Sequence, residues 1–201
     1  MFVKKFVACG ALVFAATLSS SGAADDVVPF PIAPIESEIV EPETLESLAV
    51  PSEAAIFENF KMIGETRFRV MWLRIYDAEL RTSGDQFSWD EPFALSLVYA
   101  RDITASRLVN SSLQEIAKNT GTDPNELEVY RPALERCFPS VLEDDRITGF
   151  ADPEGISTFF LNGEKHCQVD EPGFQRAFFG IWLGDQTRDD DKSRDLRGLA
   201  R

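Results

Sequence analysis

The sequence predicts an α+β fold in which helices cover an antiparallel sheet. The prediction rests on two observations. Segments with the two-residue period of strands and segments with the helical period come in blocks: strands, two helices, a hairpin and then a helix. Strands that occur in runs, rather than alternating singly with helices, favour an antiparallel sheet with the helices on one side.

The first block contains the early strands. A large apolar residue stands at every second position from Phe68 to Trp72, which predicts a strand over 67–72. The segment 75–80 continues this strand after a bend. Pro92 then interrupts the chain before a strongly apolar strand over 93–100.

Two helices are expected next. Asp102 or Thr104 can cap the first, whose apolar residues recur at helical spacing until Gly121 ends it. Asp123 begins the second helix, and Pro132 inside it predicts a kink or a break because proline removes a backbone donor.

The remaining elements follow these helices. Asn162 and Gly163 predict a tight hairpin turn, because both central positions of such a turn need positive φ. A helix with an apolar stripe comes next, and Gly184 ends it. We predict strands at 146–150, 156–161 and 164–169, a helix from about 170 to 184, and a short charged helix at 193–199.

The N-terminal residues have the pattern of a cleavable export signal. Lys4 and Lys5 provide a positive start, an apolar run extends from Phe6 to Leu18, and a stretch of small residues ends at Ala24. The apolar run is short for a bilayer span, although a retained anchor is the alternative. We therefore expect residues 1–24 to be removed and the protein to be periplasmic or secreted.

The segment 25–53 has a different composition from the rest of the chain. Proline and glutamate recur through it, and such a segment buries too little apolar surface to offset the entropy of ordering. We predict an acidic, Pro-rich disordered linker; a tail that binds a partner is the alternative. Residues 54–201 are left as one domain of ordinary size.

The net charge limits the classes of binding partner, and the cysteine content indicates a disulfide. The net charge of −14 disfavours binding to nucleic acid and to anionic membranes. Of the three cysteines, Cys9 would leave with the signal, and Cys137 and Cys167 would remain. Two cysteines in an exported protein predict a disulfide, with two reduced buried thiols as the alternative.

Motifs for metal, cofactor and nucleophilic chemistry are missing from the sequence. His166 is the only histidine, and no second ligand stands beside it at a suitable spacing. The sequence contains neither a Gly-x-Ser-x-Gly elbow nor a phosphate-binding glycine loop. We therefore expect no metal and no cofactor.

Basic and aromatic residues on the predicted strands are the candidates for a site. Arg67, Tyr99 and Arg101 lie on or beside two of these strands. A guanidinium offers five fixed donors, which suit a carboxylate or a phenolate. The alternative is that each arginine lies on the surface and pairs with one of the many carboxylates, where it contributes little.

Three segments of the chain resemble the bacterial, exported branch of the chalcone-isomerase-like superfamily. They are Gly64–Arg67 leading into Leu73–Leu80, then Ala94–Ile103, and finally Phe159–Gly163 followed by Ala177–Gly184. The resemblance covers about residues 57–184. It implies an open-faced β-sandwich with a cleft between the sheet and the helices. Some members of the superfamily isomerise a chalcone to a flavanone, and others bind fatty acids in that cleft.

The family's functional residues carry over only in part. Its guanidinium falls on Arg67, but its catalytic threonine falls on Met71, which has no hydroxyl. Its tyrosine and asparagine fall near Ala105 and Ser112. The resemblance therefore implies that ring closure would lack the electrostatic assistance of these donors.

We therefore expect a non-catalytic domain that binds a fatty acid or a similar small apolar anion, with Arg67, Met71, Tyr99 and Arg101 at the site. Two alternatives stay open. One is an active isomerase or lyase on a phenolic or enone substrate, and the other is an envelope protein that docks a partner through its acidic linker. We expect no nucleic-acid partner and no membrane span after the signal is removed.

Overall fold

The computed structural model describes residues 50–185, 187 and 190–199. The predicted export signal and residues 25–49 of the predicted linker lie outside this part of the chain. The elements in order are α2 (Glu53–Asn59), β1 (Lys61–Val70), β2 (Leu73–Thr82), β3 (Phe93–Tyr99), α3 (Ala105–Thr120), the 3-10 helix η1 (Glu126–Tyr130), α4 (Arg131–Cys137), β4 (Arg146–Ala151), β5 (Ser157–Leu161), β6 (Glu164–Val169), α5 (Phe174–Leu183) and α6 (Asp190–Leu196).

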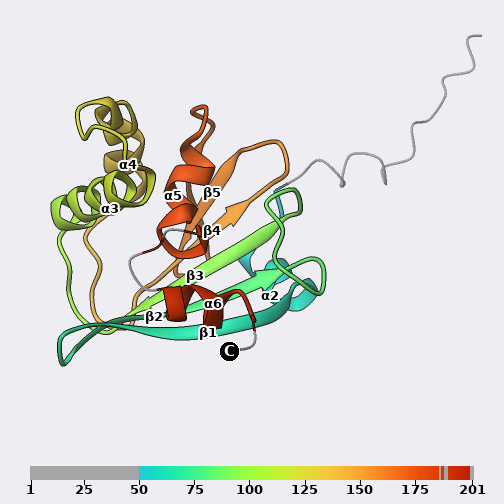
Figure 1. Ribbon diagram of the computed structural model, residues 1–201. Coiled ribbons are helices and arrows are strands. Elements are labelled where there is room, and N and C mark those ends of the chain that lie inside the picture. Colours follow the sequence, from blue (N-terminus) through green and yellow to red (C-terminus); the bar gives the residue numbers. More distant parts are fainter. Residues whose placement is uncertain (1–49, 186, 188–189, 200–201) are drawn as a thin grey trace, which may run out of the picture. The chain divides into compact units, whose positions relative to one another are not determined.

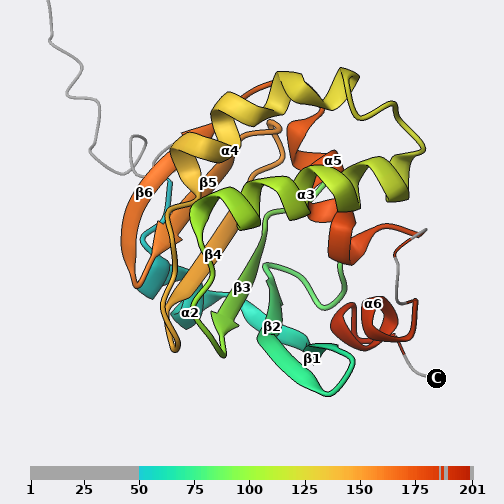
Figure 2. The same ribbon diagram turned by 90° about the vertical axis from the view of Figure 1, so that its left-hand side faces the viewer.

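The six strands form one antiparallel sheet whose spatial order is the order of the sequence, from β1 to β6. Helices α3, α4 and α5 lie over one face of this sheet (Figures 1 and 2). The predicted α+β class, with helices covering an antiparallel sheet, is confirmed. The helical segment α3–η1–α4 is inserted between β3 and β4, so the strands form two runs of three.

The core between the sheet and these helices is rich in phenylalanine. On β3, Phe93, Leu95 and Leu97 alternate toward the helices, as a two-residue period requires. Phe159 on β5 and Phe178 on α5 lie edge to face, with ring centroids 5.3 Å apart. Aromatic pairs of this geometry stabilise a core by about 0.5–1.5 kcal/mol beyond the burial of their area.

Helix α2 covers the other face of the sheet, where no helix was expected. Ser52 caps it by accepting a hydrogen bond from the Ala55 amide, and Ile56 packs on this second face. Glu53 is almost fully buried and pairs with Arg146 on β4, with 2.7 Å between the guanidinium and the carboxylate. The boundary predicted between residues 53 and 54 therefore falls inside α2.

The predicted strand over 67–72 is wrong at its end. Strand β1 begins earlier, at Lys61, and stops at Val70, because Met71 and Trp72 form the turn into β2. Met71 has a φ of 57°, which a strand cannot accommodate. The alternation from Phe68 to Trp72 imitated a longer strand, since the turn residues are themselves large and apolar.

The segment 75–80 does not continue the first strand after a bend, because it belongs to β2, which reverses direction and pairs with β1 antiparallel. The remaining predicted elements differ only in detail. Pro132 does break the second helix, which divides into η1 and α4 with the proline in the first turn of α4. The last helix begins at Asp190, earlier than expected. It lies so close to β1 that a Cβ on Gly64 would stand 2.2 Å from the Leu196 carbonyl oxygen. In the described residues, none of the helices combines the length and apolar character that a membrane crossing needs.

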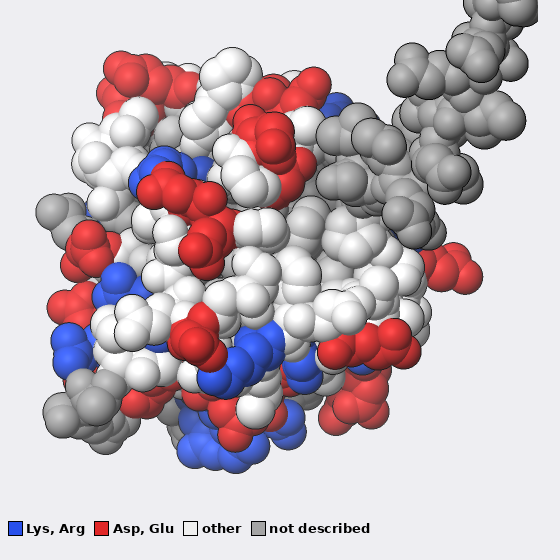
Figure 3. Space-filling model, turned by 90° about the vertical axis from the view of Figure 1, so that its right-hand side faces the viewer, with Lys and Arg blue, Asp and Glu red and all other residues white. Residues whose placement is uncertain are grey.

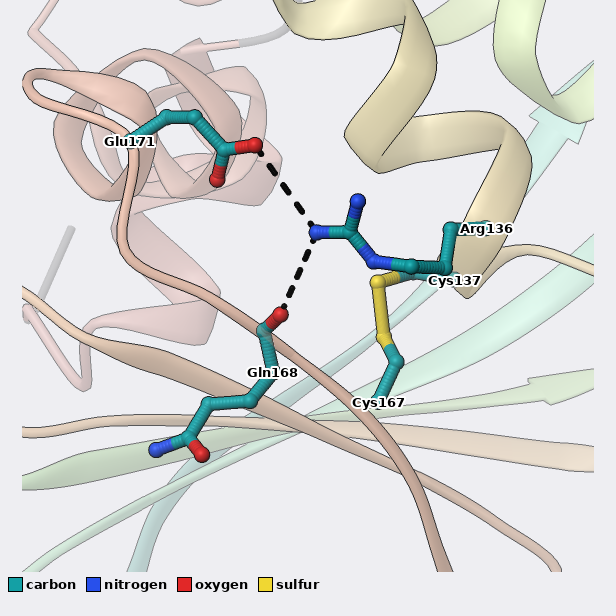
Figure 4. Close-up of a disulfide and its surroundings, with 5 residues drawn as sticks. All are labelled: Arg136, Cys137, Cys167, Gln168 and Glu171. Atoms are coloured by element: carbon teal, nitrogen blue, oxygen red, sulfur yellow. Dashed lines mark hydrogen bonds and ion pairs between the residues drawn. A yellow bond between two sulfur atoms is a disulfide. The ribbon is translucent and has the colours of Figure 1, made fainter.

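The predicted disulfide between Cys137 and Cys167 is confirmed (Figure 4). It joins the last residue of α4 to β6, with 5.4 Å between the two Cα atoms. Beside it, Arg136 donates a hydrogen bond to the Gln168 carbonyl at 3.4 Å and pairs with Glu171 at 3.7 Å. The edge of the sheet at β6 is therefore fastened to the helical layer by a covalent bond.

Candidate functional site

A cavity of about 550 Å³ lies between the sheet and the helices. Its floor comes from the end of β1, the start of β2 and the end of β3, and its other walls come from α3, α5 and α6. Figure 2 shows these elements from the side on which the β1–β2 turn, α3 and α6 face the viewer. The volume falls within the range of small-molecule binding sites.

Aromatic rings make up much of the cavity wall. Tyr76 and Tyr99 are register partners on β2 and β3, and their rings lie edge to face with centroids 5.9 Å apart. The indole Nε1 of Trp182 donates a hydrogen bond of 2.9 Å to the Tyr76 hydroxyl. The aromatic residues that line the cavity are Phe68, Tyr76, Tyr99, Phe138, Phe178 and Trp182.

The hydroxyl groups of the two tyrosines differ in their bonding. Burial raises the pKa of both Tyr76 and Tyr99 above the ordinary value of tyrosine, so both stay protonated near neutral pH. Tyr76 already accepts the bond from Trp182. The Tyr99 hydroxyl makes no hydrogen bond with any residue in the described part of the chain. It is therefore available to donate a hydrogen bond to a bound molecule.

Cations without acidic partners gather at this cavity. Within the described residues, four Lys or Arg side chains make no ion pair: Arg69, Arg101, Arg107 and Lys165. The three arginines all line the cavity, whereas Lys165 lies on β6. The chain has 34 acidic residues against 20 basic ones, so an arginine without a partner is unusual here.

Acidic and small polar groups complete the lining. Asp102 accepts a hydrogen bond from the Glu143 amide, and Glu115 pairs with Lys118 at 2.6 Å. Both carboxylates are therefore engaged with other protein groups. Ser111 and Ser112 on α3 add hydroxyls. The arrangement suits a molecule with an apolar body and a negatively charged group.

Three of the four predicted site residues lie at this cavity. Met71, Tyr99 and Arg101 line it, and Arg67 does not. Arg67 lies opposite Asp77 in the register of β1 and β2 and pairs with it at 3.1 Å. Its partner and its exposure match the surface alternative. Whether any of the four residues contacts a ligand remains a prediction.

The neighbouring arginine, Arg69, lines the cavity although the sequence did not predict it. The register of β1 and β2 shifts between Phe68 and Arg69, and this irregularity brings Arg69 to the cavity although Arg67 faces away from it. Arg107 on α3 and the hydrogen-bonded pair of Tyr76 and Trp182 also line the cavity and were not among the predicted site residues. The resemblance placed the tyrosine and the asparagine of the isomerases near Ala105 and Ser112. Of these two positions, Ser112 lines the cavity and Ala105 does not.

No cluster of three or more metal-binding side chains occurs in the part of the chain that the structure describes. His166 is an exposed residue of β6. The cavity is therefore a candidate site for binding an organic anion through arginine and tyrosine side chains.

A sequence model of the family described as chalcone isomerase-like matches residues 72–196. The fold is similar to that of a fatty-acid binding protein from Arabidopsis thaliana, with a TM-score of 0.55 and 14% sequence identity over 80% of this chain and 95% of that one. A search of curated proteins found no match.

Proposed function

Since the chain belongs to the chalcone isomerase-like family, we propose that it is an exported, non-catalytic member that binds a fatty acid or a similar small apolar anion. The hydrocarbon part of the ligand would lie along the aromatic wall of the cavity. Arg69, Arg101 and Arg107 would surround its charged group, and the Tyr99 hydroxyl would donate to it.

The observation that carries this proposal is the grouping of the unpaired arginines. In a chain with an excess of carboxylates, most of the described arginines pair with an acid, whereas these three, which are also exposed, do not. All three border one cavity whose surface is mostly aromatic and aliphatic. An apolar anion supplies both the missing negative charge and the missing apolar contact.

The similar solved structure supports the same reading. It is the structure of a fatty-acid binding protein, and its fold is similar to that of this chain. The arrangement of sheet and helices therefore accommodates such a ligand in at least one protein. Export is proposed on the pattern of residues 1–24 and agrees with the Cys137–Cys167 disulfide, because disulfides persist in oxidising compartments.

The first experiment is native mass spectrometry of the protein purified from the cells that make it. We expect a bound species with the mass of a fatty acid or a related lipid. Added palmitate should bind to any fraction of the protein that is empty. A protein that is consistently empty and does not take up added fatty acids would overturn the proposal.

Substitutions test where the anion lies. In a displacement assay with a fluorescent fatty acid, Arg101→Gln and Arg107→Gln should each raise Kd by about tenfold, because each removes a charge-assisted hydrogen bond. Lys165→Gln is the matched control, since Lys165 is also unpaired but lies outside the cavity, and Kd should stay unchanged. Arg67→Gln should likewise leave Kd unchanged, because Arg67 pairs with Asp77 away from the cavity.

An isomerase or lyase acting on a phenolic or enone substrate is the second candidate. The Tyr99 hydroxyl favours it, because a free donor inside a cavity could polarise a ketone. The raised pKa values of Tyr76 and Tyr99 count against it, since neither hydroxyl can serve as a base near neutral pH. Turnover of a chalcone, followed by absorbance and abolished by Tyr99→Phe, would favour the enzyme.

A further inference from the structure

The turn between β1 and β2 exposes three consecutive large apolar side chains. The exposed fractions are 52% for Val70, 88% for Met71 and 82% for Trp72. The turn lies at the free end of the hairpin, at the lower left of Figure 1. Single exposed apolar residues are ordinary on protein surfaces, but a contiguous group at a projecting turn indicates an interaction surface.

The local charge differs in sign from the charge of the whole chain. Residues 67–74 read RFRVMWLR, with three arginines and no acid, although the chain has a net charge of −14. Arg69 and Arg74 lie directly opposite each other in the register of β1 and β2. Like charges placed opposite each other destabilise a hairpin, so this pair has no evident role in folding.

The arginines of the turn are only partly neutralised. Asp77 pairs with Arg67 at 3.1 Å and with Arg74 at 2.6 Å, so one carboxylate serves two guanidiniums. Arg69 has no ion pair within the described residues. A surface with excess positive charge and exposed apolar side chains matches an anionic lipid bilayer, where phosphates accept from guanidinium groups and tryptophan lies at the level of the headgroups.

Other acidic residues limit the size of this surface. Glu143 and Asp144 lie close enough to Arg74 to help raise its pKa, after the larger contribution of its hydrogen bond to Asp77. Their negative charge reduces the excess of positive charge at the Arg74 end of the turn. On the opposite end of the molecule, acidic and basic side chains are interspersed (Figure 3). The turn combines apolar exposure with local positive charge.

We propose that the β1–β2 turn docks on anionic lipid bilayers, with Met71 and Trp72 inserted among the headgroups and Arg69 bound to lipid phosphates. Val70 and Met71 also line the cavity, so docking would bring the opening of the cavity to the bilayer surface. The inference goes beyond the proposed function, because the turn can dock whether or not the cavity binds a ligand.

Vesicle flotation tests this proposal. Protein purified from the cells that make it should float with phosphatidylcholine vesicles that contain phosphatidylglycerol, and less with phosphatidylcholine alone. Trp72→Ser should lower the vesicle affinity by more than about tenfold, because it removes the largest inserted side chain. Arg69→Gln should lower it by about fivefold, and the loss should appear only with the anionic lipid.

Val129→Ser is the matched control, because Val129 is 65% exposed on η1, outside the turn. All variants share one N-terminus, so any affinity of that segment for lipid cancels in the comparison. Equal flotation of Trp72→Ser and Val129→Ser would overturn the docking. Displacement of the fluorescent fatty acid without vesicles is measured on the same variants. Trp72 does not line the cavity, so Trp72→Ser should leave ligand binding unchanged. Arg69 does line it, so Arg69→Gln should weaken ligand binding as well, and Trp72→Ser is the variant that separates loss of docking from loss of ligand binding.

Discussion

The hairpins at the two edges of the sheet have two-residue turns of opposite character. In the β5–β6 turn, Asn162 and Gly163 both have positive φ, and the Asn162 side chain accepts from the Arg146 amide at 2.8 Å and donates to Asp145 at 2.9 Å. In the β1–β2 turn, Met71 takes the positive φ and its side chain is exposed. The sequence Asn162-Gly163 favours a tight turn, because both residues adopt positive φ readily. The sequence Met71-Trp72 does not favour one, because methionine rarely adopts positive φ.

The hairpins also differ in what fastens them to the rest of the protein. The disulfide ties β6 to α4, and a Cβ on Gly163 would stand 3.3 Å from Glu53 Oε2, beneath the turn. The β1–β2 turn has no comparable anchor among the described residues. We infer that the β5–β6 edge is built for stability and that the β1–β2 end is built for contact with other molecules.

Removing the disulfide should have the largest effect on the fastened edge. We expect Cys137→Ala with Cys167→Ala to lower the free energy of unfolding by about 3–4 kcal/mol, because the bridge restricts the unfolded chain across 30 residues. Urea unfolding of the two proteins measures this difference. A thiol assay on the unfolded natural protein should detect no free thiol at these two positions. An unchanged free energy would show that other contacts hold β6.

The next effect concerns Glu53. Its replacement by alanine leaves Arg146 and the buried Thr148 hydroxyl without their carboxylate. We expect a loss of about 2–3 kcal/mol in the free energy of unfolding, below the value for a fully buried pair because the Arg146 side chain is 38% exposed. Glu58→Ala on the same helix is the control, and it should change the stability by less than about 0.5 kcal/mol. Similar losses in both variants would mean that helix propensity, and not the buried pair, is being measured.

A matched pair of substitutions compares the turns directly. Gly163→Ala should lower the free energy of unfolding by about 1–2 kcal/mol, because φ is 98° there. Met71→Asn should raise it by about 0.5 kcal/mol, because asparagine tolerates the positive φ better than methionine. Thermal unfolding would detect both signs. A loss of stability in Met71→Asn would mean that the methionine makes contacts that stabilise the fold.

The smallest effect is in the pH dependence of stability. Partial desolvation of Asp77 opposes ionisation, but hydrogen bonds from Arg74 and Arg67 outweigh it and hold the pKa of Asp77 below its ordinary value. Hydrogen bonds from the Leu142 amide and from Asn162 lower the pKa of Asp145. Each carboxylate therefore stabilises the fold above the ordinary aspartate pKa, and the stabilisation is lost as the pH falls through the lowered value.

Salt distinguishes these two carboxylates. In urea unfolding near pH 7, the destabilisation by Asp77→Asn should shrink in about 1 M NaCl, because the partners of Asp77 are charged and exposed. The destabilisation by Asp145→Asn should persist, because the partners of Asp145 are neutral donors. An equal response to salt in both variants would contradict this assignment.

Elements whose local sequence agrees with the final structure could be predicted. Strand β3, helix α3, the break at Pro132 and the Asn162-Gly163 turn all follow from period, proline and glycine. The turn at Met71 could not, because two apolar residues continue the alternation of the strand before them. Helix α2 was missed because seven residues at the end of a proline-rich segment give no periodic signal.

The site was predictable only where strand position determined it. Tyr99 and Arg101 follow from the end of a strong strand. Arg69 depends on a one-residue irregularity in the pairing of β1 with β2, which the sequence does not reveal. Arg107 and Trp182 come from helices whose placement over the sheet is decided by tertiary packing, so their approach to Tyr76 and Tyr99 had no local signature.

The order of the strands has a consequence for the kinetics of folding. Each strand pairs with its neighbour in the sequence. Only β3 and β4 are separated by a long segment, the helices from Ala105 to Cys137, so their pairing closes a much larger loop. Local contacts form early because little chain entropy is lost in closing short loops. We expect β1–β3 and β4–β6 to form as two early hairpin units, and the docking of the inserted helices between them to set the overall rate.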